Sequence, residues 1–275
     1  RVREALITTF NFEFINETIN GDPQPRITSY FSNSILGMSH APAEGRVAEF
    51  LAPFADTLPP GVIEGYSLPE GDGTERNRRN LRKALGLMDE AGWTLGDDGL
   101  LKNAAGDPFA FDILLSSGAT ETQQIVDIYA AALERLGAQV TVTVSDSAEL
   151  KERTNAFDFD MTWYSRGLSL SPGNEQNLYW GSEAADTQGS RNWMGMKSPA
   201  AEAMIDRLLN SESQDDFRAA AKALDRVLTA GRYVVPIWHS PVARIAHDAK
   251  LRYPSSLPMY GDWIGFQPDV WWYEE

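Results

Sequence analysis

Strand and helix patterns alternate between residues 109 and 164, and this run constrains the fold more than any other feature of the chain. The strand patterns cover residues 109–116, 139–144 and 157–164, and the helical patterns cover 121–136 and 146–155. Gly137 is positioned to stop the first helix, and Asp146 is a good N-cap for the second. Because strands that alternate with helices assemble into a sheet flanked by helices, the pattern predicts an α/β layer.

Helical patterns also flank this layer on both sides. We expect an interrupted helix over 1–20, a structured loop over 21–43, and further helices over 45–58, 76–92, 198–210 and 213–230. The turn pairs Asp98-Gly99 and Gly106-Asp107 predict a hairpin after the AGW turn. Residues 233–238 have the apolar pattern of a strand, with 241–246 as its continuation or its partner.

The charge balance excludes some classes of function. With 39 acidic and 24 basic residues the net charge is −15, which argues against nucleic acid because binding phosphates takes a basic surface. No apolar run approaches the roughly 20 residues needed to span a bilayer. The chain has no cysteine, and its three histidines (40, 239 and 247) are too scattered to suggest a metal site. We expect no metal and no cofactor.

The first six residues, RVREAL, have the pattern of the inside of an amphipathic helix, with no capping residue before them. We therefore expect the chain to be part of a longer protein.

Several segments, in this order along the chain, resemble the family 5 extracellular solute-binding proteins of ABC transporters, the oligopeptide and dipeptide binders. These segments are RVREAL, ALGLMDEAGWTLGDDGLLKNAAGDPFAFDILL, ALERLGAQVTVTV, KSPAAEAMID and YVVPIWHSPVARI. Two others, TSYFSNSILGMS and LSPGNEQNLYWGS, are most similar to the branch that binds microcin C and related formylated peptides. The resemblance covers nearly the whole chain.

The resemblance implies the fold: an α/β lobe of the type II periplasmic-binding-protein kind, a mixed sheet flanked by helices. It implies that residues 1–237 form the carboxy-terminal ligand-binding lobe, and that 238–275 return to a first lobe absent here. The implied function is that of the substrate-binding component of an ABC importer in the bacterial periplasm, a monomer that performs no chemistry. Its partners would be a peptide or peptide-like ligand, the membrane permease and the missing N-terminal half.

In peptide-binding relatives an aspartate just after the strand at 157–164 pairs with the α-amino group of the ligand. The matching positions here are Gly167 and Leu168, and no acid follows until Glu175. Because an unpaired cation in a buried cleft costs several kcal/mol, we expect a ligand that is N-blocked or uncharged at its amino end.

The expected ligand contacts lie in three loops. They are Trp163, Tyr164, Arg166, Gly167, Ser169 and Asn174 after the strand, Asn192 in NWMGMKSP, and Tyr30, Ser32 and Asn33 in the early loop. Neighbouring strand residues face opposite ways, so one of Trp163 and Tyr164 is expected to be core. The bland alternative for Ser169, Asn174 and Asn192 is turn and capping use.

Two other functions stay open at this point. The tryptophan count favours an oligosaccharide binder of the same family. Asp158 and Asp160 share one face of the expected strand and resemble the carboxylate pair of a carbohydrate-active enzyme, although a solvated strand edge also explains them.

Overall fold

The computed structural model describes residues 1–240, 242, 245–258, 266–267 and 269–275. The chain divides into two compact units. The first comprises Arg1–Pro23 and Ile27–Ile237, and the second comprises Gln24–Arg26 and Trp238–Glu275. One limit of the first unit falls at Ile237, and the assignment of residues 1–237 and 238–275 to two different lobes stays a prediction.

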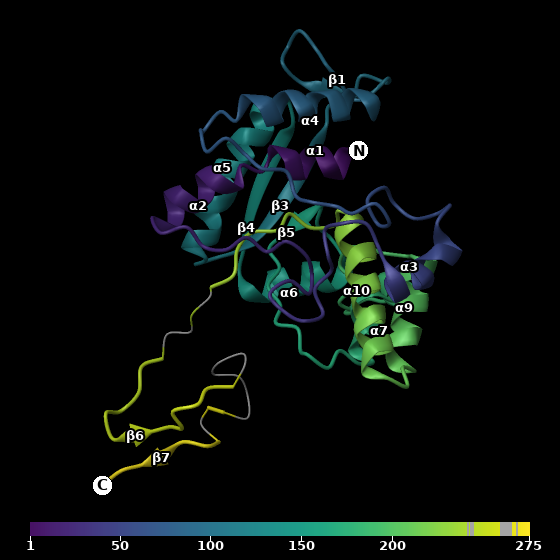
Figure 1. Cartoon of the computed structure of the whole chain (residues 1–275). Coiled ribbons are helices and arrows are strands. Elements are labelled where there is room, and N and C mark those ends of the chain that lie inside the picture. The colour runs from purple at the N-terminus through teal and green to yellow at the C-terminus, as the bar shows by residue number, and fades with distance from the viewer. Residues whose placement is uncertain (241, 243–244, 259–265, 268) are drawn as a thin grey trace. The chain divides into compact units, whose positions relative to one another are not determined.

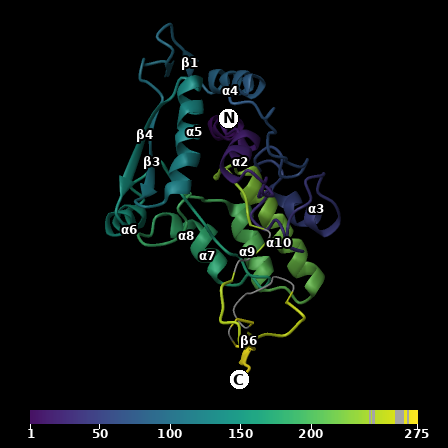
Figure 2. The same ribbon diagram turned by 90° about the vertical axis from the view of Figure 1, so that its left-hand side faces the viewer.

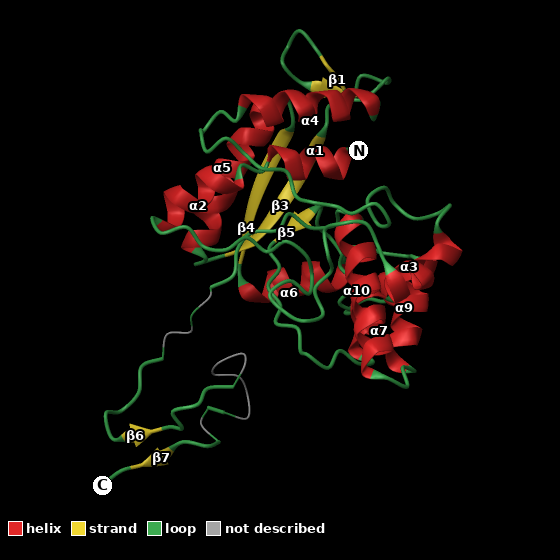
Figure 3. Cartoon of the chain, in the orientation of Figure 1, coloured by secondary structure: helices red, strands yellow, loops and turns green. Residues whose placement is uncertain are grey.

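A three-stranded parallel sheet forms the centre of the first unit (Figure 3). Its order is β4–β3–β5, with β3 at Ala110–Ser116, β4 at Gln139–Ser145 and β5 at Met161–Thr162. The register pairs Ile113 with Val142 on one side and with Met161 on the other. The apolar centre of β3 is buried, as expected for a strand between two neighbours.

Two helices connect these strands. Helix α5 (Thr120–Leu136) leads from β3 to β4, and α6 (Ser147–Ala156) leads from β4 back across to β5. Figures 1 and 2 show α5 running along the sheet, and α6 at the opposite end of the strands from β1. Because the chain moves to one side of β3 and then to the other, the strand order reverses at β3. In open α/β sheets, ligands bind beyond the carboxyl ends of the strands at such a reversal.

Local signals fix the ends of these elements as predicted. Asp146 caps α6 by accepting hydrogen bonds from Ala148 N and Glu149 N. Gly137 ends α5 with a φ of 101°, and a Cβ there would lie 2.8 Å from Leu95 Cδ1, so only glycine fits. The α/β layer is therefore confirmed.

The N-terminal helices pack on the same unit. The elements are α1 (Val2–Thr9), α2 (Phe12–Asn20), α4 (Arg78–Glu90) and the hairpin β1 (Thr94–Leu95) with β2 (Leu101–Lys102). A small core gathers Ala5 of α1, Ala84 and Met88 of α4, Leu101 of β2 and Leu136 of α5. The predicted interruption between α1 and α2 and the predicted hairpin are both confirmed.

A second and larger core lies among the remaining helices. These are α3 (Gly45–Leu51) with the 3₁₀ turn η1 (Ala52–Phe54), α7 (Glu175–Trp180), α8 (Ser182–Ala185), α9 (Pro199–Leu209) and α10 (Gln214–Ala230). Figure 1 shows α7, α9 and α10 side by side. Ser198 and Ser213 cap α9 and α10 through their hydroxyls, as their positions predict.

Helix α10 also holds the early loop through two adjacent buried charges. Asp225 accepts hydrogen bonds from Phe31 N and Met38 N and from the Ser29 hydroxyl. Arg226 donates to four backbone carbonyls, those of Ser39, Ala41, Val62 and Ile63. The loop that carries Tyr30 is therefore fixed to the helical core by polar contacts as well as by apolar packing.

Two predicted strands are wrong in extent. Only Met161–Thr162 of residues 157–164 pairs with β3, because Phe157, with a φ of 58°, ends α6, and the Asp160 carboxylate accepts from Asp112 N. Residues 233–238 form no strand beyond one isolated bridge between Arg26 and Trp238. Pro236 lacks the N–H that a ladder needs, which explains the interruption.

The second unit contains a short antiparallel pair, β6 (Leu251–Arg252) and β7 (Trp272–Tyr273). Rings pack around Trp271, with centroids 4.8 Å away for Tyr253 and 5.3 Å for His247. The predicted partner strand at 241–246 lies partly outside the described residues.

Candidate functional site

The loop after β5 leaves the sheet at the carboxyl end of a strand beside the reversal of strand order. Trp163 and Tyr164 begin this loop and differ in exposure: 37% of the Trp163 surface is accessible, whereas Tyr164 is half-buried. The Tyr164 ring packs edge-on against Trp193 at a centroid distance of 5.4 Å. Tyr164 is thus the more buried of the two, and Trp163 is the one open to solvent.

Arg166 lies among three aromatic rings. Its guanidinium carbon is 3.2 Å from the centroid of Tyr179, 4.7 Å from that of Tyr164 and 5.2 Å from that of Trp180. Cations are attracted to aromatic faces within about 6 Å, so the rings hold the side chain in place. Tyr179 and Trp180 lie on α7, so this short helix supplies two of the three rings.

Burial and charge both act on Arg166. No carboxylate among the described residues forms an ion pair with it, and its Nη1 is buried with no hydrogen-bond partner there. Burial lowers the pKa of Arg166 to about 10, and the positive charge of Arg191 adds to this effect. The side chain still carries its charge at neutral pH, so the site holds a cation without a counter-ion.

Tyr30 joins this group from the early loop. Its ring lies edge-on to Trp180 at 5.1 Å, and its hydroxyl donates to the Met194 sulfur at 3.1 Å. Burial, with the nearby charge of Asp225, raises the pKa of the Tyr30 hydroxyl well above its usual range. We call Tyr30, Tyr164, Tyr179, Trp180 and Trp193, together with Arg166, the Arg166 cluster.

Sequence reasoning named only three members of this cluster: Tyr30, Tyr164 and Arg166. Tyr179, Trp180 and Trp193 were not among the expected ligand contacts. The break at Pro172-Gly173, which is followed by the helix-compatible segment EQNLYW, is the signal that could have found two of them, because a short helix can bring its aromatic residues back to the loop that precedes it.

Asn192 is fully buried, and its amide is used within its own loop. Its Nδ2 donates to the carbonyls of Gly181 and Met196, and its Oδ1 accepts from Met196 N at 3.0 Å. These contacts match the turn-forming alternative. That Asn192 lines a ligand pocket stays a prediction.

Two of the other expected contacts, Ser169 and Asn174, form hydrogen bonds within their own turns. The Ser169 hydroxyl accepts from Ser171 N, and Asn174 Oδ1 accepts from Asn177 Nδ2, so both serve local turns. Gly167 and Asn33 are exposed and Ser32 is half-buried. Their roles in ligand binding stay predictions.

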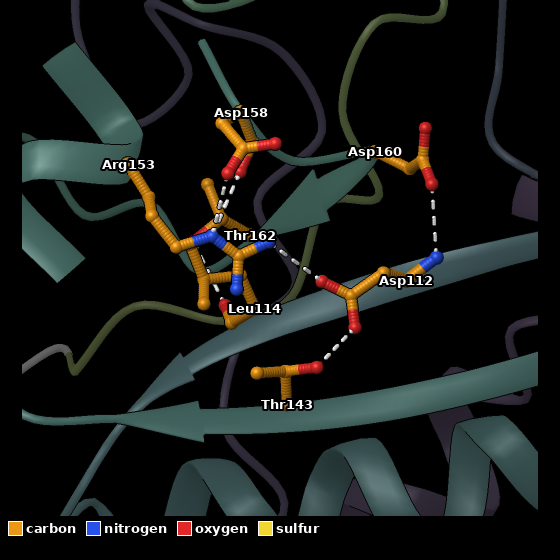
Figure 4. A network of polar contacts seen from close by, with 7 residues as sticks. All are labelled: Asp112, Leu114, Thr143, Arg153, Asp158, Asp160 and Thr162. Carbon is orange, nitrogen blue, oxygen red and sulfur yellow. Dashed lines mark hydrogen bonds and ion pairs between the residues drawn. The ribbon is translucent and has the colours of Figure 1, made fainter. Parts of the chain in front are cut away.

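Asp158 and Asp160 each have a structural partner (Figure 4). Arg153 of α6 bonds Asp158 Oδ2 at 3.1 Å and Asp112 Oδ2 at 3.3 Å, and Asp160 Oδ2 accepts from Asp112 N at 2.9 Å. Asp112 also accepts from the Thr143 hydroxyl. The network connects α6 and the residues just before β5 to Asp112 of β3. Asp158 and Asp160 therefore make structural contacts here, unlike the free carboxylates of a catalytic acid and base pair.

Neither a metal-binding cluster nor a membrane-spanning helix is found in the described part of the chain. Within the described ranges, no group of three or more His, Cys, Asp or Glu side chains is placed to hold a metal ion. Over the same residues, no helix has both the length and the apolar character needed to cross a bilayer.

Comparison with known proteins gives the family. Residues 1–188 match the family model described as bacterial extracellular solute-binding proteins, family 5 Middle. The chain is 41% identical over 273 residues to the uncharacterized protein y4wM of Sinorhizobium fredii, and 38% identical over 273 residues to the probable peptide-binding protein YejA of Agrobacterium fabrum. In both cases 99% of this chain is covered, but only 40% and 44% of the relative.

A solved structure confirms the fold. The oligopeptide-binding protein AppA of Bacillus subtilis, in complex with a nonapeptide, matches 100% of this chain and 47% of its own, with a TM-score of 0.69 at 17% identity. The chain therefore spans less than half the length of these relatives. The predicted family and the predicted absence of enzymatic function both agree with a family of binding proteins. The chain belongs to the family 5 bacterial extracellular solute-binding proteins.

Proposed function

We propose that this chain is one lobe of a solute-binding protein that captures peptides or peptide-like solutes with a blocked or uncharged amino end. Residues 1–237 are the ligand-binding lobe, and 238–275 belong to the other lobe of the longer protein. The two lobes close over the ligand by a hinge, and the closed monomer delivers it to an ABC permease in the bacterial envelope.

The observation that carries this proposal is the charge of the loop after β5. A ligand with a free α-amino group needs a carboxylate partner when it is buried. This loop presents Arg166 instead, and its nearest following acid, Glu175, accepts from Gly173 N and Gln176 Nε2. The loop therefore offers a free amino group no unpaired carboxylate, whereas a formylated amino end brings no charge that needs one.

The relatives support the peptide part of the proposal. YejA of Agrobacterium fabrum is named a probable peptide-binding protein, and AppA was solved with a nonapeptide. The resemblance of residues 28–39 and 170–182 to the branch that binds formylated peptides points to the same ligand class.

Calorimetry on the full-length protein tests the proposal. The ligands are formyl-Met-Leu-Phe and the same tripeptide with a free amino group, and we expect the formylated form to bind at least tenfold more tightly, which is about 1.4 kcal/mol. Tight binding of the unmodified peptide that formylation abolishes would refute it. Native mass spectrometry of ligands that co-purify with the protein is an independent check.

Oligosaccharide binding is the second candidate, and the exposed Trp163 favours it because aromatic faces beside a few polar groups suit sugars. A glycan that binds the full-length protein while the formylated peptides do not would favour this alternative.

A further inference from the structure

Two hydrogen-bond donors in the Arg166 cluster lack acceptors. Arg166 Nη1 and the Tyr164 hydroxyl oxygen are both buried, and neither has a hydrogen-bond partner among the described residues. The two side chains are in contact, since the guanidinium carbon lies 4.7 Å from the Tyr164 ring centroid. Because a buried donor without an acceptor costs about 1–3 kcal/mol, and more for a charged one, two together need an explanation.

The rings orient the guanidinium but cannot accept its in-plane hydrogens. Tyr179 lies against the guanidinium at 3.2 Å from its centroid. Packing on an aromatic ring leaves hydrogen-bonding capacity at the fork of N–H groups, which matches carboxylate and phosphate oxygens. Arg166 remains half-buried, so the cluster is not sealed from solvent.

Among the described residues, a second positive charge lies near Arg166 and no carboxylate forms an ion pair with it. Arg191 is close enough to act on Arg166 electrostatically, and Arg166 has no ion pair within the described part of the chain. Other buried charges on the same unit are satisfied: Asp225 accepts from several donors and Arg226 donates to four carbonyls. Arg166 differs from both because its buried Nη1 has no hydrogen-bond acceptor within the described part of the chain.

We propose that the Arg166 cluster is a subsite for an anionic group of the ligand, a carboxylate or a phosphate monoester. The anion accepts hydrogen bonds from the Arg166 guanidinium and from the Tyr164 hydroxyl, beside the partly buried ring of Tyr179. The inference rests on the proposed function for the peptide-like nature of the ligand, and adds that the captured solute carries a negative charge at this end of the cleft.

Three probes separate the sources of the anion in calorimetric titrations of the full-length protein. They are formyl-Met-Leu-Phe as the free acid, its C-terminal amide, and a formyl-Met-Leu-phosphoserine amide whose only anion is the phosphate. We expect at least one anionic probe to bind about 10- to 150-fold more tightly than the neutral amide, since a hydrogen bond to a charged group contributes about that factor. Equal binding of all three would overturn the proposal.

Variants assign the effect to the cluster. Arg166→Gln is expected to reduce the ratio of anionic to neutral binding to near one, and Tyr164→Phe to reduce it about 2- to 12-fold. Arg207→Gln is the matched control, because Arg207 also packs on an aromatic ring, 4.5 Å from Phe50, and it is expected to leave the ratio unchanged. A ratio that survives in Arg166→Gln would overturn the proposal.

A readout that does not depend on peptide binding keeps the two proposals distinct. If none of the peptides binds, inorganic phosphate is titrated while tryptophan fluorescence is followed, because Trp180 and Trp193 lie in the cluster. A change in the wild-type protein that is lost in Arg166→Gln supports the anion subsite although the proposed function fails. No change, or the same change in both proteins, overturns the subsite as well.

The melting temperature without ligand tests the structural explanation. A buried arginine that is retained for ligand binding lowers the stability of the ligand-free protein. The Arg166→Met variant is therefore expected to melt at the same temperature as the parent or higher. If Arg166 only fixes the rings, this variant melts lower and the ratio of anionic to neutral binding does not change in Arg166→Gln, which would overturn the proposal.

Discussion

Replacing Arg226 by lysine tests how the early loop is held on α10. The Arg226 side chain is 1% exposed, and its guanidinium reaches four carbonyl oxygens in two segments of the chain. The distances are 2.6 Å to Val62 O and Ser39 O, and 3.0 Å to Ala41 O and Ile63 O. Burial lowers the pKa of Arg226, and the charges of Glu64 and Asp225 act in the opposite direction.

The expected loss follows from the number of acceptors. Three different guanidinium nitrogens bond Val62 O, Ser39 O and Ala41 O, and a lysine has a single nitrogen at one point, so at least one of these carbonyls loses its partner. A buried carbonyl without a donor costs about 1–3 kcal/mol, and the free energy of unfolding is expected to fall by at least that amount. Arg226→Met removes all four bonds and leaves three carbonyls without a donor, since Ile63 O still accepts from Ala43 N. The cost of about 3–9 kcal/mol is comparable to the whole stability of a typical domain, so we expect this variant not to fold.

Urea unfolding followed by tryptophan fluorescence measures the effect, with Arg218→Lys as the control. Arg218 is exposed on the same helix, so its replacement is expected to change the free energy of unfolding by less than about 0.5 kcal/mol. If Arg226→Lys is as stable as this control, the four bonds contribute no net stability. An Arg226→Met variant more stable than the parent would show that the burial of the charge outweighs its hydrogen bonds.

Three further variants have definite expectations. Asp146→Ala is expected to lower the urea midpoint at pH 7. Because the hydrogen bonds of the cap lower the pKa of Asp146, the difference in midpoint between parent and variant is full above about pH 4 and shrinks as the pH falls through the lowered pKa. A difference in midpoint that persists in acid would contradict this. Asn192→Ala leaves the Met196 carbonyl and the Met196 N–H unsatisfied, whereas Gly181 O still accepts from Ala184 N, and it is expected to cost about 2–6 kcal/mol by urea unfolding; unchanged stability with lost ligand binding would make Asn192 a ligand contact instead. Gly65→Ala is expected to cost at least about 2 kcal/mol, because Gly65 has a φ of 102° and the new Cβ would meet His40 O at 2.2 Å; thermal unfolding within a degree of the parent would refute the clash.

The sequence was enough to predict most of the α/β layer because its signals are local. Gly137 requires a left-handed backbone, Asp146 and Ser213 have the side chains that cap helices, and the apolar face of α5 has the helical period. Each of these acts within a few residues of itself. Local propensity and the final fold agree in such segments, and the sequence pattern is then sufficient.

The extent of β5 could not be predicted, because it is decided by contacts across the sheet. Residues 157–164 alternate like a strand, but Arg153 pairs with Asp158, and Asp160 occupies the Asp112 N–H. The same contacts explain why two acids on one expected face were ambiguous. Their partners come from α6 and β3, and no spacing rule within the segment reveals them.

The candidate site was predicted in part for a similar reason. The loop after the strand and Arg166 were identified from the sequence, and the structure adds the rings of Tyr179, Trp180 and Trp193. Asn192, in contrast, is taken up by its own loop. Polar residues in loops have two uses, and the sequence does not distinguish between them.

Arg166 and Arg226 show what the structure adds to a list of arginines. Both are withdrawn from solvent, and burial lowers the pKa of each. Arg226 has four carbonyl acceptors within 3.0 Å, whereas Arg166 has aromatic faces and a buried Nη1 without an acceptor. A buried cation whose acceptors belong to the protein stabilises the fold, and one whose acceptors are missing costs stability until something else supplies them. Methionine at the two positions should therefore act in opposite directions, preventing folding at 226 and leaving the empty protein as stable or more stable at 166.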